Sequence, residues 1–358
     1  KEELLGTRGF SGRSSTLYHI QMPTQVAALE RLEDRRPQPV EDEMFQHRHL
    51  KTLNIPWKGN AVSGRIPIMF NNDVILAYAH TAEPMPYFFK NADGDEALYI
   101  HRGSGKLESI FGSVPYGPGD YLVIPRGTIY RLEEDQPGTR IFVIESSTPI
   151  EVPQRYRNEY GQLLEDAPFR ERDIRVPETL ETKQESGRHE VRILARGIMN
   201  AYHYDFHPFD LIGWDGYVYP FAFNVNDFQP ITGQIHLPPP IHQTFEAGNY
   251  VICSFVPRML DYHREAVPAP YNHSNIDSDE VLFYANDKFA SRRGIEEGSI
   301  TLHPAGIPHG PQPGATEASL GKTETKELAV MVDTFYPLHI TQQALALEDS
   351  EYPFSWQE

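Results

Sequence analysis

Two stretches of this sequence, one in each half, match each other without a gap. One is YFFKNADGDEALYI, which begins at Tyr87, and the other is YNHSNIDSDEVLFY, which begins at Tyr271. Downstream and in the same order, GDYLVIPRGTIYR from Gly119 matches GSITLHPAGIPHG from Gly298. Two motif pairs that recur in one order at similar intervals predict a duplicated domain. In the first motif pair the identical positions include Tyr87 and Tyr271, Asn91 and Asn275, Asp93 and Asp277, Asp95 and Asp279, and Glu96 and Glu280.

The sequence pattern of the duplicated unit indicates a β domain. Short aromatic and β-branched runs such as DYLVIP and YVICSFV are punctuated throughout by 30 prolines and 26 glycines, which is typical of all-β proteins. We therefore expect two β-sandwiches of the jelly-roll type with a few peripheral helices, the clearest over residues 23–33 and 338–349. The charged segment 169–193 is the best boundary, which predicts domains over 1–178 and 179–358.

Composition limits the partners and the compartment. A formal charge of -18 argues against nucleic acid, because phosphate binding needs clustered Lys and Arg. No window is apolar enough to span a bilayer, and the first residues lack a signal pattern, so we expect a cytoplasmic protein that does not associate with membranes. Cys253 is the single cysteine, so a metal site must use histidine and carboxylate ligands.

The second copy differs from the first at the positions that could bind a metal. It has His273, Glu280 and His309 where the first copy has Phe89, Glu96 and Tyr130. Two imidazoles and one carboxylate form the facial triad of non-heme Fe(II) oxygen chemistry, although Mn(II), Ni(II) or Zn(II) fit the same ligands. The first copy should not bind metal in this way.

The acidic residues between the ligands have a different expected role. Asp277 and Asp279 both have counterparts in the first copy, which lacks the histidines. Acidity alone is therefore not specific to a metal site, and we expect these two side chains to cap the turn by bonding local backbone groups.

The order and spacing of the motifs resemble the two motifs of the cupin superfamily. The stretch HPFDLIGWDGYVYPFAFNVNDFQPITG from His207 is similar to the central signature of the homogentisate 1,2-dioxygenase family, and LHPAGIPHGP from Leu302 is similar to its metal turn. The resemblance covers most of the chain. It implies a bicupin fold, Fe(II) in the C-terminal half, O2 as co-substrate, oligomers built on trimers, and ring cleavage of homogentisate to maleylacetoacetate.

Individual roles follow from the resemblance. It implies His273, Glu280 and His309 as iron ligands, His236 as an acid or base near the substrate hydroxyl, and His303 as a second pocket histidine. Strand alternation allows His303 to point inward or outward, and we expect inward. His242 is an alternative to His236 that we interpret as structural.

Two departures from the family pattern bear on the substrate. Six residues separate His273 from Glu280, where the family has five, and Phe289 stands where the family has a substrate-contacting tyrosine. Loss of that hydroxyl can change discrimination between polar substrates. Arg292 and Arg293 follow closely and could supply positive charge for an anionic substrate, although solvent-facing loop charges are the alternative interpretation.

Three other functions are compatible with these residues. A dioxygenase for a related hydroquinone or catechol acid would use the same ligands. A non-catalytic cupin that binds a small ligand would consume no oxygen, and a metal-dependent isomerase would turn over substrate anaerobically. The HPFDLIGWDG stretch favours the ring-cleaving dioxygenase over the last two.

Overall fold

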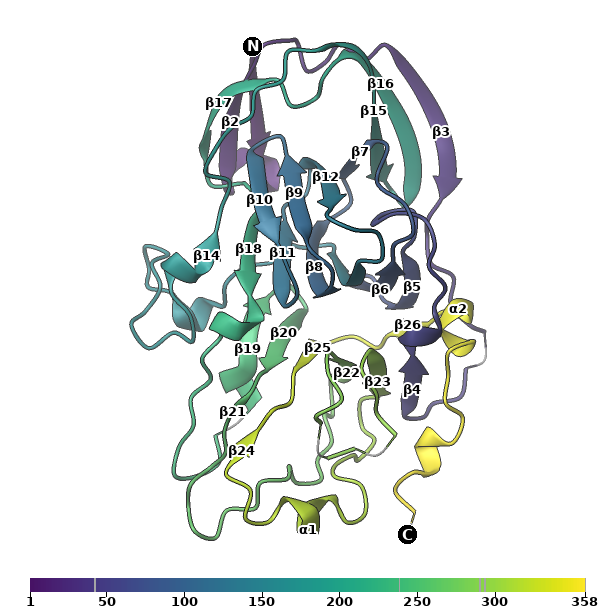
Figure 1. Ribbon diagram of the computed structural model, residues 1–358, viewed down its shortest axis with the longest axis vertical. Coiled ribbons are helices and arrows are strands. Elements are labelled where there is room, and N and C mark those ends of the chain that lie inside the picture. The colour runs from purple at the N-terminus through teal and green to yellow at the C-terminus, as the bar shows by residue number, and fades with distance from the viewer. Residues whose placement is uncertain (42, 238, 290, 293, 358) are drawn as a thin grey trace.

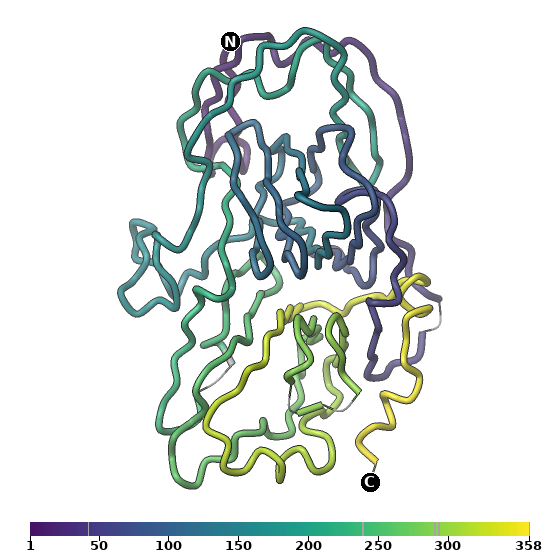
Figure 2. The backbone as a smooth tube through the Cα atoms, in the orientation of Figure 1, coloured from purple at the N-terminus to yellow at the C-terminus, as the bar shows by residue number. Residues whose placement is uncertain are grey.

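A computed structural model of the chain describes residues 1–41, 43–237, 239–289, 291–292 and 294–357. The described part is mostly β-strand, and its α-helices, α1 (Ala315–Ser319) and α2 (Gln342–Leu345), are short and peripheral. The all-β expectation is confirmed. Two β bodies follow each other along the long axis, and the two chain ends lie at opposite ends of the molecule (Figure 1, Figure 2). The short 3-10 helices are Arg8–Phe10, Thr52–Asn54, Gln154–Tyr156, Glu171–Asp173, Val225–Asp227, Pro239–His242 and Tyr352–Phe354.

The N-terminal body is a sandwich of two large sheets, with a smaller sheet at its outer end. The eight-stranded sheet has the order β14 (Ile174–Arg175), β18 (Phe221–Asn224), β11 (Asp120–Ile124), β8 (Asp95–Arg102), β13 (Arg140–Ser146), β6 (Val74–His80), β5 (Ile66–Phe70) and β26 (His339–Ile340). The seven-stranded sheet has the order β10 (Gly112–Tyr116), β9 (Gly105–Ser109), β12 (Ile129–Glu134), β7 (Phe88–Asn91), β15 (Ser186–Ala195), β16 (Ile198–Phe206) and β3 (Ala28–Asp34). The outer sheet pairs β1 (Glu2–Gly6), β2 (Ser14–His19) and β17 (Leu211–Gly216).

The C-terminal body is built on one six-stranded sheet that loops cover on one face. Its order is β19 (Gln243–Glu246), β20 (Tyr250–Phe255), β25 (Ala329–Thr334), β22 (Asp279–Tyr284), β23 (Ser299–His303) and β4 (Arg48–Lys51). A two-stranded ribbon, β21 (Arg258–Met259) with β24 (Glu324–Thr325), lies in the covering loops.

The two bodies pack back to back through an aromatic core. Phe142 of the eight-stranded sheet stacks on Phe283 of the six-stranded sheet, with ring centroids 4.9 Å apart. Tyr121 contacts Phe245 in the same layer, with centroids 5.5 Å apart. Because side chains alternate across a strand, Glu280 of β22 lies on the opposite face, away from the N-terminal body.

The terminal segments are exchanged between the bodies. Strand β4, from the N-terminal part of the chain, pairs with β23 and completes the C-terminal sheet. Strand β26, from the C-terminal part, pairs with β5 and completes the eight-stranded sheet.

The expected boundary between residues 178 and 179 does not separate the two bodies. Strands β15 and β16 lie beyond it and still belong to the seven-stranded sheet, where β15 runs parallel to β7. The charged segment 169–193 that marked the boundary lies within the N-terminal body, because it contains β14 and most of β15, which belong to the two large sheets of that body.

The expected helix over residues 23–33 is also wrong, because residues 28–34 form β3. This strand pairs with β16 along the sheet edge, and its residue Leu32 packs against the interior of the sandwich. Pairing with a neighbouring strand outweighs the helical spacing of the apolar residues. Of the other expected helix, over residues 338–349, only α2 (Gln342–Leu345) is α-helical.

The duplicated motifs occupy equivalent places in the two bodies. The Gly127 N–H donates to the Asn91 carbonyl at 2.8 Å, and the Gly306 N–H donates to the Asn275 carbonyl at 2.6 Å. Both glycines have a positive φ, +87° and +81°, a conformation that favours glycine. The alignment of the two sequence halves therefore holds at the level of individual hydrogen bonds.

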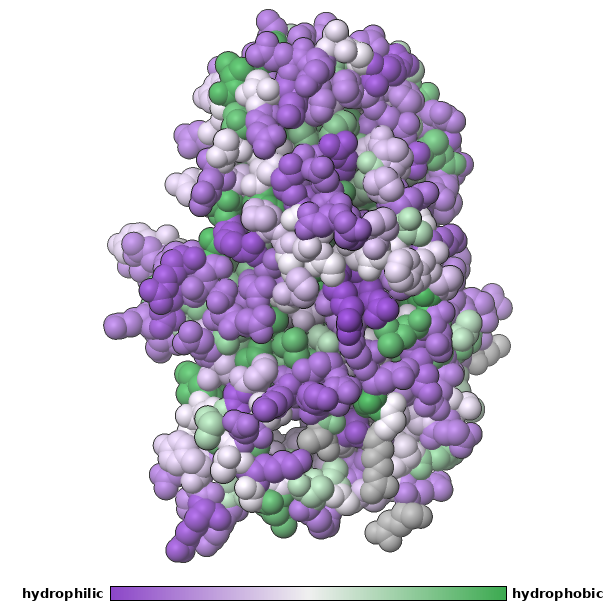
Figure 3. All heavy atoms as spheres, viewed as in Figure 1, coloured by the Kyte–Doolittle hydropathy of each residue, from purple (hydrophilic) through white to green (hydrophobic). Residues whose placement is uncertain are grey.

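The surface is polar on the side shown in Figure 3. Hydrophilic residues dominate the face in view, and hydrophobic ones form small separate patches (Figure 3). Within the described residues, the helices are all too short or too polar to cross a membrane.

Candidate metal centre

Three side chains converge on the loop-covered face of the C-terminal sheet. His273 lies in the loop before β22, Glu280 lies on β22, and His309 lies in the turn after β23. One potential ligand atom of each lies within 4.8 Å of the others. The Nε2 atoms of His273 and His309 lie 3.7 Å and 3.3 Å from the Glu280 carboxylate oxygens.

The backbone brings the two histidines together. His273 and His309 form an isolated antiparallel bridge, in which each N–H donates to the other residue's carbonyl, at 2.8 and 2.9 Å. This bridge sets their rings 4.3 Å apart. The sixth residue between His273 and Glu280 is accommodated in the loop, so the longer spacing does not separate the two side chains.

Hydrogen bonds on the far side of each ring aim the ligand nitrogens at the centre. The Nδ1 atom of His273 lies 3.1 Å from the Tyr271 carbonyl, and that of His309 lies 3.3 Å from the Ile307 carbonyl. A carbonyl only accepts, so each Nδ1 carries the proton and each neutral ring keeps an Nε2 lone pair. The buried Nε2 of His309 has no hydrogen-bond partner among the described residues, as expected for an atom that awaits a cation.

The charges at this centre also fit a cation. Burial alone would raise the pKa of Glu280, but the adjacent imidazole rings of His273, His303 and His309 bring it well below the usual range. Asp333 lies directly opposite Glu280 on the neighbouring strand β25. Burial and the Glu280 charge raise the pKa of Asp333, and its Oδ1 is buried without a partner in the described part of the chain. Two close carboxylates favour a divalent ion between the ligands.

The same place in the N-terminal body holds an arginine. Glu96 on β8 is fully buried and accepts hydrogen bonds from Arg65 and, at 2.6 Å, from the Tyr130 hydroxyl. Arg65 also bonds Glu145 at 2.9 Å and lies over the Phe89 ring. Phe89, Glu96 and Tyr130 are the counterparts of the candidate ligands. The protein supplies its own cation here, which supports the expectation that the first copy does not bind metal in this way.

Of the two aspartates in the repeated turn, Asp279 does bond backbone N–H groups, but these belong to distant segments of the chain and not to the local turn that we expected. The carboxylate of Asp279 accepts from the N–H groups of Ala305 and Leu338, both at 2.8 Å. Asp95 accepts from two backbone N–H groups at the equivalent places in the first body, at 2.9 and 3.1 Å. Asp277 is exposed. Neither Asp277 nor Asp279 belongs to the metal cluster.

His303 points inward, as expected. It lies opposite Glu280 in the register of β22 and β23, and its Nδ1 is 2.8 Å from the Glu280 Oε1. Burial lowers the pKa of His303 to about 3, although Glu280 acts to raise it. The counterpart of His303 in the first body is Ile124, which faces Glu96 in the same register. His303 therefore also distinguishes the two copies.

His236 lies at the rim of the centre on an exposed loop. Its Nδ1 is 3.3 Å from the Asp261 carboxylate, and its ring centroid is 5.4 Å from that of Tyr271. The Tyr271 ring in turn lies 6.1 Å from His273. His242 is buried, with its ring against Phe255, which agrees with a structural interpretation.

The expected substrate contacts fall in different surroundings. Phe289 packs against Tyr284, with ring centroids 4.9 Å apart, and offers no polar group. Arg292 turns inward, bonds the Gly310 carbonyl beside His309, and lies 5.7 Å from the Trp356 ring. The solvent-facing interpretation of Arg292 is therefore wrong. Arg293 lies outside the described residues.

Sequence reasoning missed the residues that enclose the centre from both chain ends. His47, just before β4, contacts the rings of His303 and His309 at 5.4 and 5.9 Å. Tyr352 bonds His303, and Trp356 contacts His47 at 5.1 Å. The aromatic residues of EYPFSW near the end of the sequence were the only signal. Nothing in the sequence linked this segment, or the distant His47, to the candidate metal centre.

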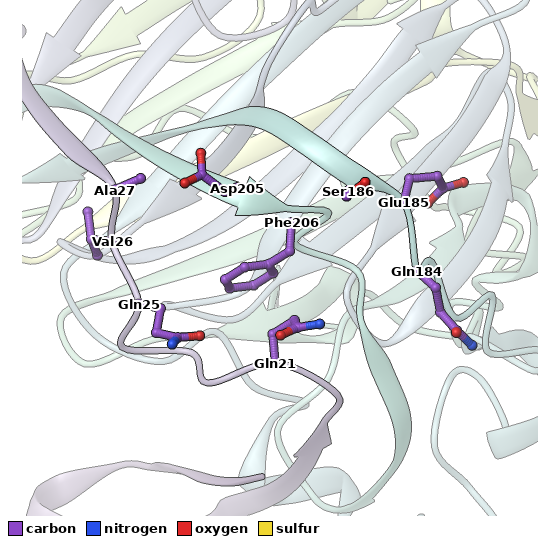
Figure 4. Close-up of a pocket in the computed structure, with 9 residues that line it drawn as sticks. All are labelled: Gln21, Gln25, Val26, Ala27, Gln184, Glu185, Ser186, Asp205 and Phe206. Atoms are coloured by element: carbon purple, nitrogen blue, oxygen red, sulfur yellow. The ribbon is translucent and has the colours of Figure 1, made fainter.

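A separate pocket lies in the N-terminal body, between the loop before β3 and the ends of β15 and β16 (Figure 4). The described residues that line it include no histidine, lysine or arginine. It therefore offers carboxylates, from Glu185 and Asp205, but no cationic side chain for an acidic ligand.

The chain is similar in sequence to known proteins over most of its length. A family model described as homogentisate 1,2-dioxygenase N-terminal matches residues 59–225. The chain is 42% identical over 359 residues to the putative dioxygenase SSO1533 of Saccharolobus solfataricus, covering 99% of this chain and 93% of that protein. It is 26% identical over 296 residues to homogentisate 1,2-dioxygenase of Rhodopseudomonas palustris, covering 78% of this chain. The chain spans 64% of the length of that relative.

Among solved structures, a cupin 2 conserved barrel domain protein from Leptotrichia buccalis aligns with a TM-score of 0.38 at 11% identity, over 82% of this chain and 99% of that one. A mutant of Bacillus subtilis oxalate decarboxylase also aligns with a TM-score of 0.38 at 11% identity, over 87% of this chain and 84% of that one. The match along nearly the whole chain at 42% identity, together with the family model and the homogentisate 1,2-dioxygenase relative, shows that this protein is a divergent member of the homogentisate 1,2-dioxygenase family.

Proposed function

We propose that this protein is an Fe(II)-dependent ring-cleaving dioxygenase that inserts O2 into a hydroxylated aromatic acid, with homogentisate as the first substrate to test. The proposal rests on one observation: the Nε2 atoms of His273 and His309 both point toward the Glu280 carboxylate, while the Nδ1 atom of each ring is bonded to a main-chain carbonyl. A bound iron would supply dioxygen activation and would acidify a phenol.

The chain's own residues would bind and orient the acid. Arg292 carries a positive charge beside Gly310, and its Nε is buried without a hydrogen-bond partner among the described residues. A guanidinium is suited to a carboxylate because it offers several donors in a fixed plane. We infer that Arg292 holds the side-chain carboxylate of the substrate, with the Trp356 ring fixing the guanidinium.

His236 would move the phenolic proton. Its Nδ1 lies beside the Asp261 carboxylate, so the neutral ring keeps Nε2 free to accept a proton. An imidazole is a common general base at neutral pH. The loop would need to bring His236 from the rim to the bound ring.

A related substrate is the second candidate, and Phe289 favours it. This side chain is packed on Tyr284 and cannot donate a hydrogen bond, where the family pattern has a tyrosine. A hydroquinone or catechol acid that makes no hydrogen bond at this place would lose nothing, whereas homogentisate would lose one contact.

Oxygen uptake tests the proposal. The purified chain, loaded with Fe(II), should consume O2 with homogentisate, gentisate or a related acid, and His309→Ala should not. No uptake with any of these acids despite bound iron would exclude the dioxygenase and leave a ligand-binding cupin. Anaerobic conversion of the acid would instead indicate an isomerase.

The remaining expectations about assembly stay proposals. A homo-oligomer built on trimers predicts an integral multiple of three chains by light scattering. Binding to nucleic acid, which we do not expect of this acidic protein, is tested by a shift of the elution volume on mixing.

A further inference from the structure

The segment near the C-terminal end supplies a tyrosine to the metal centre. Tyr352 begins the last 3-10 helix, is 3% exposed, and places its hydroxyl 3.0 Å from Nε2 of His303. Nδ1 of the same ring lies 2.8 Å from Oε1 of Glu280. A continuous chain of hydrogen bonds therefore joins the C-terminal segment to the candidate ligand carboxylate.

The chemistry of the three groups fixes the direction of these bonds. An ionised carboxylate can only accept, so the proton between His303 and Glu280 belongs to Nδ1. A neutral imidazole then has an unprotonated Nε2, which accepts from the Tyr352 hydroxyl. Burial also raises the pKa of Tyr352, which keeps the phenol protonated. Both ring nitrogens of His303 are thus occupied.

We propose that Tyr352, through His303, is a positioning residue of the metal centre that holds the Glu280 carboxylate in its ligating orientation. The inference rests on the metal site of the proposed function. It changes the expected role of His303 from a group that contacts substrate to one that acts through Glu280. Partners of this kind behind a metal ligand set its orientation and basicity.

Two further observations support a specific role. The first body, which has Arg65 in place of a metal, has Ile124 at the His303 position and so cannot form this relay. In addition, Trp356 donates from Nε1 to the Gly310 carbonyl at 3.1 Å. The segment that carries Tyr352 is thereby fixed against the turn that carries His309.

The test is the Co(II) affinity of the full-length Tyr352→Phe variant, measured by competition with a chelating dye. This change removes only the hydroxyl and keeps the ring that packs on Trp356. We expect Co(II) to bind about 10-fold more weakly or worse, with a changed visible spectrum of the bound ion. Tyr121→Phe is the matched control, because its buried hydroxyl bonds Ser254 at 2.8 Å in the core between the bodies. It should bind Co(II) like the wild type.

A second pair of variants separates the relay from packing. His303→Gln keeps a donor for Glu280 and an acceptor for Tyr352, whereas His303→Leu keeps neither. We expect His303→Gln to retain most of the affinity that His303→Leu loses, and Tyr352→Phe to cause no further loss in the His303→Leu background.

Two results would overturn the relay. If Tyr352→Phe bound Co(II) as tightly as the wild type, the relay would be refuted and the metal site would remain. The relay would also be refuted if Tyr352→Phe lowered the Co(II) affinity equally in the wild-type and His303→Leu backgrounds. If the wild-type chain binds no metal at all, the proposed function and the relay both fail. Thermal melting of the metal-free variants confirms that each comparison is made on folded protein.

Discussion

The two bodies of this protein use one buried glutamate in two ways. In the first body, Glu96 is neutralised by Arg65, a cation that is part of the chain. In the second body, the equivalent Glu280 faces His273 and His309 and no arginine ion pair to it is described. The strand, the turn and the carboxylate are the same, and the source of positive charge differs.

The comparison extends to the neighbouring carboxylate. Glu145 lies opposite Glu96 in the first body, as Asp333 lies opposite Glu280 in the second. Arg65 bonds both acids of the first pair, whereas Asp333 has an unpartnered buried oxygen in the described residues. Each body therefore has two acidic residues at equivalent positions. Only the pair in the second body has no arginine described beside it and could be neutralised by an exchangeable ion.

Replacing a ligand should have the largest effect. His309→Ala removes one of three ligands, and we expect metal binding and oxygen uptake to become undetectable. The matched change in the first body is Tyr130→Phe, which should leave metal binding unchanged and lower the free energy of unfolding by about 1–3 kcal/mol. Metal analysis and chemical denaturation of both variants check this. Metal loss in Tyr130→Phe would contradict the division of roles.

Removing the internal cation should have the next largest effect, on stability alone. Arg65→Met leaves Glu96 and Glu145 buried without their partner, and breaking such a pair costs about 3–5 kcal/mol. We expect a lower urea midpoint and an unchanged metal content. Arg65→Met combined with Glu96→Gln should recover part of the loss. A variant as stable as the wild type would show that Arg65 does not compensate these charges.

The repeated turn should respond equally in both bodies. Asp279→Ala and Asp95→Ala each leave two backbone N–H groups without acceptors, which predicts a loss of about 1–3 kcal/mol for each unpaired group. Asp277→Ala, at an exposed position, should change stability by less than about 0.5 kcal/mol. If Asp279→Ala lost metal without losing stability, Asp279 would belong to the metal site instead.

The smallest effect is a pH dependence confined to the outer sheet of the first body. His19 lies 2.7 Å from Asp210 and 3.1 Å from Glu3. Burial would lower its pKa, but these carboxylates outweigh burial and raise the pKa to about 9. The resulting stabilisation is fully present below about pH 6.5, the unfolded value, and is lost as the pH rises through about 9.

Replacing His19 should flatten this profile. In His19→Gln the loss of stability between pH 7 and 10 should be smaller than in the wild type, as measured by urea denaturation at each pH. An unchanged slope would assign the pH dependence to another group.

The sequence was sufficient to identify the three side chains that converge in the candidate metal centre, because the duplication supplied an internal control. Comparing the two copies separated His273 and His309 from the acids around them, and the register of both turns is the one the alignment implies. The same comparison contained the pair Ile124 and His303, whose importance appears only when β22 and β23 are paired.

The rest depended on contacts between distant parts of the chain. His47 and Trp356 reach the centre because β4 joins the C-terminal sheet and the last segment folds back over it. No local pattern predicts such an exchange of terminal strands. The domain boundary and the helix over 23–33 were wrong for the same reason, since β3 and β15 are defined by their strand partners.

Locating the bound metal tests the central claim most directly. A crystal of the full chain soaked in Mn(II) should show one anomalous peak per chain, between His273, Glu280 and His309, and none beside Glu96. A peak beside Glu96, or full occupancy by metal in His309→Ala, would contradict the account that Arg65 has replaced the metal in the first body and that only the second body retains the site.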